Sequence, residues 1–234
     1  AAMAELDAVR HRIVPLVRDT GALVRQALAD GKRVLFEGGQ GTMLDLAYGT
    51  YPYVTSSHPT VGGILIGAGV SHRALEAVYG VVMAFTTRVG HGPFPTEVLD
   101  PDLALRLRGT GEQQWDEYGT TTGRERRCGW LDIVALRYAC RLNRLDALAI
   151  TKLDVLSGLN PIRIATRYRG AEGAIFEDFP YHQSILHSAE PDYEELPGWS
   201  EDISGSRSAE DLPKEARDYL DAIADLTGVP VRLV

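Results

Sequence analysis

The chain has few cysteines and no long hydrophobic segment. Its 234 residues include only Cys128 and Cys140, which lie twelve residues apart and outside any Cys-x-x-Cys pattern. This usage argues for a reducing compartment and against a zinc or redox site. No apolar run is long enough to span a membrane, and the N-terminus lacks a signal-peptide pattern. We therefore expect a cytoplasmic protein with no membrane partner.

Basic charge is also scarce. The chain carries 32 Asp and Glu against 24 Lys and Arg, a net charge of −8. Because nucleic-acid binding needs clustered Lys and Arg, this balance argues against a nucleic-acid partner. Three common catalytic motifs are missing: Gly-x-x-x-x-Gly-Lys-Ser/Thr, His-Glu-x-x-His and Gly-x-Ser-x-Gly. No side chain stands out as nucleophile, general base or metal ligand, so we predict no catalytic residue and no metal site in this chain.

Hydrophobic periodicity predicts an α/β fold with a mostly parallel sheet flanked by helices. Helices are expected over 6–28 with a break near Pro15, and over 74–78, 131–142 and 216–226. Strands are expected over 34–36, 148–150, 162–168 and 229–234, whereas 81–85 fits a strand or a buried helix and 62–69 a glycine-rich loop. The chain ends on an apolar strand, although ligand-binding loops normally follow such strands. We therefore expect an incomplete domain.

Two polar turns follow the strand expected at 34–36. The first contains Gly38-Gly39-Gln40-Gly41-Thr42, and the second contains Gly49-Thr50-Tyr51-Pro52-Tyr53-Val54-Thr55-Ser56-Ser57. Glycines allow backbone N–H groups to approach an anionic or heterocyclic ligand, and Gln40 and Thr55 could bind polar edges. The alternative is a tight strand-to-helix turn beside an ordinary hydroxyl-rich loop. Two such turns so close together favour a small-molecule site.

A second candidate is the loop over 118–130. It places Thr120-Thr121-Thr122-Gly123-Arg124-Glu125-Arg126-Arg127 in one stretch. The planar guanidinium pairs well with carboxylate or phosphate, and the glycines would let the loop close over a ligand. The alternative is a solvated basic turn in which Glu125 neutralises a neighbour.

A third candidate, Thr151-Lys152-Leu153-Asp154, follows the strand expected at 148–150. It is similar to the Asn-Lys-x-Asp signature of GTP-binding proteins, with Thr in the first place. An aspartate there accepts hydrogen bonds from the ring N–H and exocyclic amine of guanine, a pattern that adenine lacks. The alternative is a strand-end turn in which Asp154 caps the next segment.

Taken together, the motifs resemble those of adenylosuccinate synthetase. They occur in the family's order and cover essentially the whole chain. They are 36–42, 49–57, Thr87-Arg88-Val89-Gly90-His91-Gly92-Pro93-Phe94-Pro95-Thr96-Glu97, 121–124, Gly129-Trp130-Leu131-Asp132, 151–156 and Leu196-Pro197-Gly198-Trp199. The resemblance implies that residues 1–234 form the central and C-terminal part of a single domain related to the P-loop NTPases.

The resemblance also implies an activity. The family joins L-aspartate to IMP with GTP and Mg²⁺, giving adenylosuccinate, GDP and phosphate through a 6-phosphoryl-IMP intermediate, in AMP biosynthesis. The full-length protein is expected to be a homodimeric ligase that forms a C–N bond.

The resemblance assigns roles to individual residues. IMP contacts are expected from Gln40, Thr55, Val89 and Arg124; aspartate contacts from Thr120, Thr121, Thr122, Gly123, Arg124, Glu125 and Arg126; and GTP contacts from Arg126, Lys152, Leu153 and Asp154. Glu125 stands where many members have a basic residue, and we expect it to tune the loop.

The departures from the family pattern give a second hypothesis. The glycine-rich phosphate loop, the catalytic aspartate and histidine, and the turn that completes the guanine pocket are not in this sequence, so the Mg²⁺ ligands are expected elsewhere. We predict that this chain is inactive alone. The alternative is a non-catalytic guanine-nucleotide-binding module or regulator on the same fold.

Overall fold

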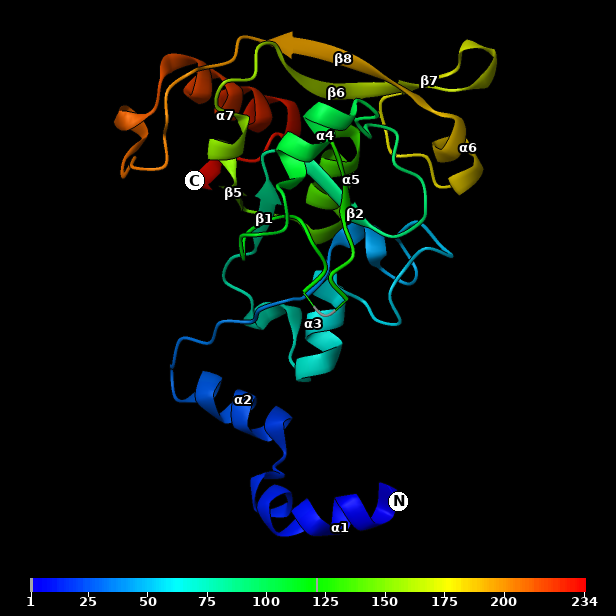
Figure 1. The fold of residues 1–234 in the computed structure, drawn as a ribbon. Coiled ribbons are helices and arrows are strands. Elements are labelled where there is room, and N and C mark those ends of the chain that lie inside the picture. Colours follow the sequence, from blue (N-terminus) through cyan, green and yellow to red (C-terminus); the bar gives the residue numbers. More distant parts are fainter. Residues whose placement is uncertain (1, 121) are drawn as a thin grey trace.

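The computed structural model describes residues 2–120 and 122–234 as an α/β body with two N-terminal helices that project from it (Figure 1). The helices are α1 (Ala2–Ile13), α2 (Thr20–Ala29), α3 (Val61–Ala68), α4 (Pro101–Arg108), α5 (Ile133–Asn143), α6 (Gln183–Ser188) and α7 (Lys214–Thr227). The strands are β1 (Tyr79–Met83), β2 (Thr86–Val89), β3 (Arg126–Gly129), β4 (Leu131–Asp132), β5 (Ala147–Thr151), β6 (Ile162–Arg169), β7 (Ile175–Phe176), β8 (Glu190–Leu196) and β9 (Val231–Leu233).

A three-stranded parallel sheet in the order β1-β5-β9 lies at the centre. The central strand β5 contributes Leu148 and Ile150, which are fully buried. Of residues 81–85, which fit either a strand or a helix in sequence, 81–83 belong to β1, because they pair in register with β5. The predicted α/β class with a parallel sheet is confirmed.

Two further sheets contain antiparallel pairs that the sequence did not predict. β2 pairs with β3 in a two-stranded antiparallel ladder. β6 pairs in parallel with β4 and antiparallel with both β7 and β8. The first of these ladders matters for the site because it leads directly into the 118–126 loop.

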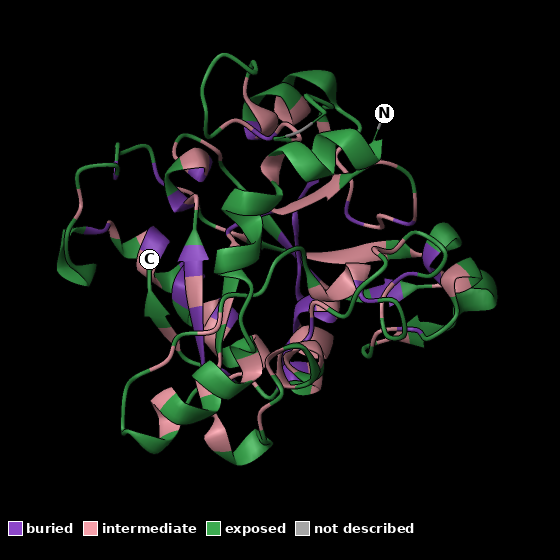
Figure 2. Cartoon of the chain, turned by 90° about the horizontal axis from the view of Figure 1, so that it is seen from below, coloured by how far each residue is buried: buried purple, intermediate pink, exposed green. Residues whose placement is uncertain are grey.

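Helices α5 and α7 are amphipathic and pack against one another beside the sheets. The side chain of Asp132 caps α5 by accepting a hydrogen bond from the Ala135 N–H at 3.0 Å. The inner face of α5 buries Ile133, Leu136 and Cys140 in the main hydrophobic cluster. Figure 2 shows the buried residues gathered in the inner strands and helix faces, with exposed residues on the peripheral helices and loops. The helices predicted at 131–142 and 216–226 are confirmed.

The N-terminal helices differ from the expectation for 6–28. Their apolar residues recur at the spacing of one helix face, but neither α1 nor α2 contains a buried residue. The expected break occurs at the short 3-10 turn Val14–Leu16, and α2 begins anew with Asp19 as its cap. In Figure 1 both helices lie away from the sheets, so periodicity correctly predicted helix but not burial.

Three local predictions were wrong. Residues 34–36 form no strand, and Leu35 is 92% exposed without a neighbouring strand among the described residues. The segment expected to be a glycine-rich loop is helix α3, where a Cβ on Gly63 would lie 1.8 Å from the His58 carbonyl oxygen. Glycine is used there for close packing. Residues 74–78 form no α-helix. Ala74 is the last residue of the short 3-10 turn His72–Ala74, and residues 75–78 are not helical.

Candidate functional site

The segment that carries Gln40 is organised around Asp45, a residue that the sequence analysis missed. Asp45 is 0% exposed, and its carboxylate accepts hydrogen bonds from Ala47 N, Tyr48 N and Thr60 Oγ1. His58 Nδ1 lies 3.1 Å from the same carboxylate. Burial raises the pKa of Asp45, but these hydrogen bonds outweigh it and the pKa falls below its usual value. One ionised carboxylate therefore ties the segment between the two polar turns to the residues that follow the second turn.

Replacing Asp45 by alanine is expected to destabilise the full-length protein by about 1.5–3 kcal/mol, because several donors lose a charged acceptor at once. Asp19, an exposed cap that accepts from Ala22 N, provides the matched control because its loss removes one exposed bond. The measurement is the urea dependence of unfolding at neutral pH. Equal losses for Asp45→Ala and Asp19→Ala would contradict the role given to Asp45.

Gln40 itself has a left-handed backbone with φ of 60° and an exposed side chain. Lys152 shares this conformation, with φ of 59°. Non-glycine residues seldom adopt it, and where they do the strain often marks a functional site. Two of the four such residues among those described are predicted ligand-binding residues.

Arg88 connects the second polar turn to strand β2. Its Nη2 donates to Thr50 Oγ1 at 3.0 Å and to the Tyr53 carbonyl at 3.1 Å, while its Nε donates to the His91 carbonyl at 3.0 Å. Burial and the charge of Arg127 lower its pKa. Arg88 thus fixes the turn that contains Thr55 beside the end of β2, where Val89 lies. In the sequence, Arg88 lies within the motif 87–97, and the family resemblance implied no role for it.

The β2–β3 ladder then brings two predicted residues together. Val89, which is 44% exposed, is opposite Arg126 in the antiparallel register. The expected ribose contact is therefore next to a residue expected to contact aspartate and GTP. The two are 37 positions apart in the chain, and only the strand pairing makes them neighbours.

The loop that precedes β3 is a tight turn with its polar groups outward. Gly123 N donates to the Gly119 carbonyl at 2.7 Å, and Gly119 N donates to the Arg124 carbonyl at 2.8 Å. Thr120, Thr122, Gly123 and Arg124 are exposed, whereas Thr121 lies outside the described residues. The side chain of Arg124 is therefore accessible to a carboxylate ligand.

Glu125 and Arg126 contact side chains at the base of this loop. Glu125 forms an ion pair with Arg108 of α4 at 3.3 Å. Arg126 Nη1 donates to Glu117 Oε2 at 3.0 Å, and its Nε is buried without a hydrogen-bond partner among the described residues. The contact of Glu125 with Arg108 agrees with a role in setting the loop, and Arg126 retains an unused donor.

The turn after β5 exposes Asp154 and buries Leu153 in the main hydrophobic cluster. The Leu153 side chain cannot reach a ligand from there, so its predicted GTP contact would be through the backbone. Within the described part of the chain the Asp154 carboxylate accepts no hydrogen bond, so the alternative in which it caps the next segment finds no support. Lys152 Nζ donates to Glu117, the same carboxylate that holds Arg126.

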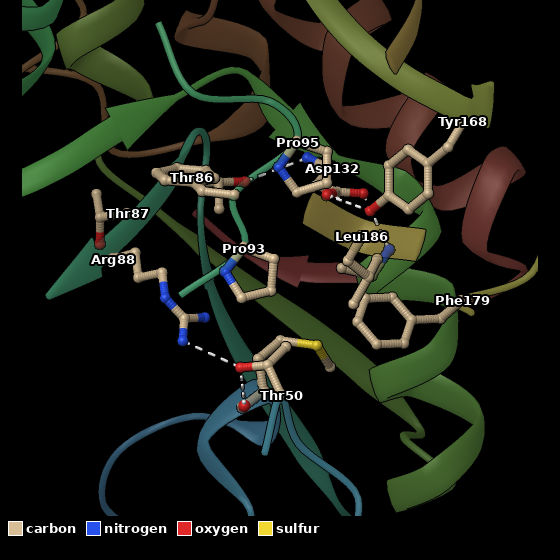
Figure 3. A pocket seen from close by; sticks show the side chains of 13 residues that line it. Thr50, Thr86, Thr87, Arg88, Pro93, Pro95, Asp132, Tyr168, Phe179 and Leu186 are labelled. Atoms are coloured by element: carbon tan, nitrogen blue, oxygen red, sulfur yellow. Dashed lines mark hydrogen bonds between the residues drawn. The ribbon is translucent and has the colours of Figure 1, made fainter. Parts of the chain in front are cut away.

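A small cavity lies beneath the site, between β2 and α5 (Figure 3). Its volume is about 80 Å³, room for a few water molecules but not a nucleotide. Thr50 and Arg88 line one side, and the buried pair Asp132 and Tyr168 lies on the other. The exposed residues above, rather than this cavity, are therefore the candidate nucleotide contacts.

Comparison with known proteins places the chain in a family. The family model described as adenylosuccinate synthetase matches residues 1–234. The chain belongs to the adenylosuccinate synthetase family. The adenylosuccinate synthetase of Desulforudis audaxviator is 57% identical over 220 residues, covering 94% of this chain and 50% of that protein. That of Moorella thermoacetica is 54% identical over 235 residues, covering 100% and 53%.

A solved structure confirms the fold. Fully ligated adenylosuccinate synthetase from Plasmodium falciparum matches with a TM-score of 0.90 and 41% identity, covering 98% of this chain and 54% of that one. The chain spans about half the length of the curated relatives it matches. The predicted resemblance to adenylosuccinate synthetase is confirmed for residues that amount to half of such a protein.

Three other features of the described residues bear on the chemistry. They contain no group of three or more His, Cys, Asp and Glu side chains able to hold a metal ion. Every helix in 2–120 and 122–234 is too short or too polar to cross a membrane. Cys128 and Cys140 are buried free thiols, and burial raises their pKa to about 12 and about 11. Such thiols are poor nucleophiles at neutral pH.

Proposed function

We propose that the full-length protein containing this chain joins L-aspartate to IMP with GTP, producing adenylosuccinate, GDP and phosphate. Family membership over all 234 residues supports this activity. The observation that links this activity to the described residues is the position of Arg126. Arg126 is opposite Val89 in the β2–β3 ladder and shares the Glu117 carboxylate with Lys152. Residues expected to bind IMP, aspartate and GTP thus adjoin one another.

In this proposal the chain recognises three ligands. Gln40 and Thr55 bind IMP together with Val89 and Arg124. The loop 120–126, including Thr121, closes over aspartate, and Arg124 and Arg126 pair with its carboxylates through their planar guanidinium groups. Asp154 accepts the two N–H groups of guanine, while the backbone at Leu153 and the stem of Lys152 cover the base.

The proposed reaction has two balanced steps. As N1 of IMP loses its proton, the C6 oxygen attacks the γ-phosphorus of GTP, and the bond from that phosphorus to the β-phosphate oxygen breaks to release GDP. The amine of aspartate then attacks C6, the C6–O bond breaks, phosphate leaves and the amine loses a proton. Arg124 and Arg126 would hold aspartate with its amine free to attack, which lowers the entropic cost of bringing the two reactants together.

In this proposal, the groups that transfer protons during the reaction lie in other parts of the full-length protein. Mg²⁺ bound to the phosphates would neutralise their charge, but the described residues include no cluster suited to hold it. We therefore propose that its ligands lie elsewhere in the full-length protein. A cytoplasmic homodimer completes the proposal, supported by family membership and by the two free thiols.

An assay of the full-length protein tests the activity. With IMP, L-aspartate, GTP and Mg²⁺, the absorbance of adenylosuccinate should appear, and omission of any one substrate should abolish it. The 234-residue chain alone should show no turnover, because the phosphate-binding and proton-transferring groups are not assigned to it. Nucleotide binding by the full-length protein without any product would favour the non-catalytic alternative, and turnover by the isolated chain would contradict the assignment of catalysis elsewhere.

A further inference from the structure

Glu117 is a buried carboxylate shared by two cations from different parts of the chain. Glu117 is only 3% exposed. Oε2 accepts from Arg126 Nη1 at 3.0 Å, and Oε1 accepts from Lys152 Nζ. Lys152 also donates to the Trp115 carbonyl at 2.5 Å. The carboxylate thus links the base of the 118–126 loop to the turn after β5.

The backbone of Glu117 holds this carboxylate in place. Its N–H donates to the Arg108 carbonyl at 2.7 Å, and its carbonyl accepts from Arg126 N at 2.9 Å. Tyr118 and Glu125 form the next bridge outward, so Glu117 is at the stem of the loop and Arg124 near its tip. A movement of the stem therefore passes to the residues expected to bind aspartate.

The link between Arg126 and Lys152 depends on the negative charge of Glu117. Glu117 is the one acidic side chain paired with either cation in the described structure. Without its charge, Arg126 and Lys152 would be two neighbouring, partly buried cations with no counter-ion, which is unfavourable. Lys152 also has a strained left-handed backbone, which persists only while its surroundings hold it.

We propose that Glu117 is a positioning residue that couples the aspartate loop to the guanine-binding turn. The inference rests on the proposed function and names a residue to which no role was assigned there. A ligand that orders Lys152 also orders Arg126 through the shared carboxylate, so GTP and aspartate raise one another's affinity. By linkage the factor must be the same in both directions.

The test uses Glu117→Gln in the full-length protein, with Asp192→Asn as the matched control. Asp192 is also a carboxylate shared by two cations, Arg167 and Arg169, but it lies on β8 and carries no predicted ligand contact. Removal of either charge leaves two arginine or lysine groups unpaired. A general loss of stability would therefore appear in both variants.

Glu117→Gln is expected to raise KM for GTP and KM for aspartate together, each by about tenfold, since charged hydrogen bonds are lost. KM for IMP and kcat should change by less than about threefold, and the factor by which GTP tightens aspartate binding should fall toward one. Asp192→Asn should leave all five quantities near wild type. An unchanged coupling factor, or equal changes in both variants, would overturn the proposal.

Two further variants keep the proposal testable if Glu117→Gln does not fold. Glu117→Asp retains the charge and should show the same paired rise in KM, but smaller. In a Lys152→Met background, Glu117→Asp should have little added effect on KM for GTP, because the ammonium group that pairs with Glu117 is already absent. Additive effects would overturn the proposal. Absence of adenylosuccinate formation by the wild-type protein would instead refute the proposed function, so the two failures are distinguishable.

Discussion

Replacing Asp154 with asparagine is expected to raise KM for GTP by about 10- to 100-fold, the equivalent of one or two hydrogen bonds to a charged acceptor. Asp154 is exposed at the end of β5 and its carboxylate is not engaged by the described residues. Asparagine retains one acceptor but presents an N–H₂ group toward the N–H donors of guanine, so one hydrogen bond is replaced by a clash of donors.

The choice of nucleotide makes this prediction sharper. Xanthine carries a carbonyl oxygen where guanine carries the exocyclic amine, so the asparagine N–H₂ can donate to it. XTP should therefore be a better substrate for Asp154→Asn than for the wild type, while ATP remains poor for both. The measurement is KM and kcat for GTP, XTP and ATP at saturating IMP and aspartate.

Asp221→Asn is the matched control, because Asp221 is an exposed aspartate on α7 that no predicted contact involves. It should leave the nucleotide preference unchanged. If Asp154→Asn retained the wild-type KM for GTP, or if the control showed the same shift, the guanine assignment would be wrong.

The second prediction concerns the pH dependence of stability at Asp132. This residue is 6% exposed, accepts from Ala135 N and accepts from the hydroxyl of Tyr168. Burial raises its pKa to about 6, although the hydrogen bonds from Ala135, Tyr168 and Val134 and the charge of Arg137 oppose the rise. The folded protein therefore holds a proton on Asp132 at pH values where the unfolded chain has released it.

The sign follows from linkage. Between about pH 4 and pH 6 the native state binds more protons at this site than the unfolded state, so the contribution of Asp132 to stability is largest below pH 4 and is lost as the pH rises through 6. The loss amounts to about 3 kcal/mol, from the difference between the native and ordinary pKa. Asp132→Asn removes this titration. The wild-type free energy of unfolding minus that of the variant should therefore fall by about 2 kcal/mol between pH 4 and pH 7, which is most of the full loss.

Urea unfolding of both full-length proteins at several pH values measures this difference, and titrations elsewhere cancel in the subtraction. Tyr168→Phe provides a control that removes one hydrogen bond and keeps the carboxylate, so most of the pH dependence should persist. A difference between wild type and Asp132→Asn that stayed constant with pH would show that Asp132 ionises normally in the folded state.

Much of the fold was predictable because strong periodicity indicates both element type and burial. The helix at α5 and the strands β5 and β6 are near the expected residues, since their apolar positions match a core-facing pattern. The same rule failed for α1 and α2, whose apolar stripe is exposed among the described residues. It also failed for α3, because its glycines suggest a loop, and only the tertiary structure shows that Gly63 packs closely against His58.

The candidate site was likewise predictable only in part. The ordered motifs around Gln40, Arg124 and Asp154 were sufficient to indicate the family, since each motif is local in sequence. Asp45 and Glu117 were missed, and Arg88 was placed in a motif without a role, because nothing nearby in the sequence distinguishes their charges from ordinary surface charges. Their importance comes from burial and from partners in other elements.

The sequence by itself determined which chemical groups this protein offers to a ligand: a glutamine in a glycine turn, a threonine- and arginine-rich loop, and an aspartate at a strand end. Only the tertiary structure decided that the threonine- and arginine-rich loop lies beside the strand-end turn and beside Val89. Strand pairing sets Val89 beside Arg126, and one buried carboxylate joins Arg126 to Lys152. The physical reason is that such contacts depend on strand register and on the desolvation of charge, which no single stretch of the chain contains.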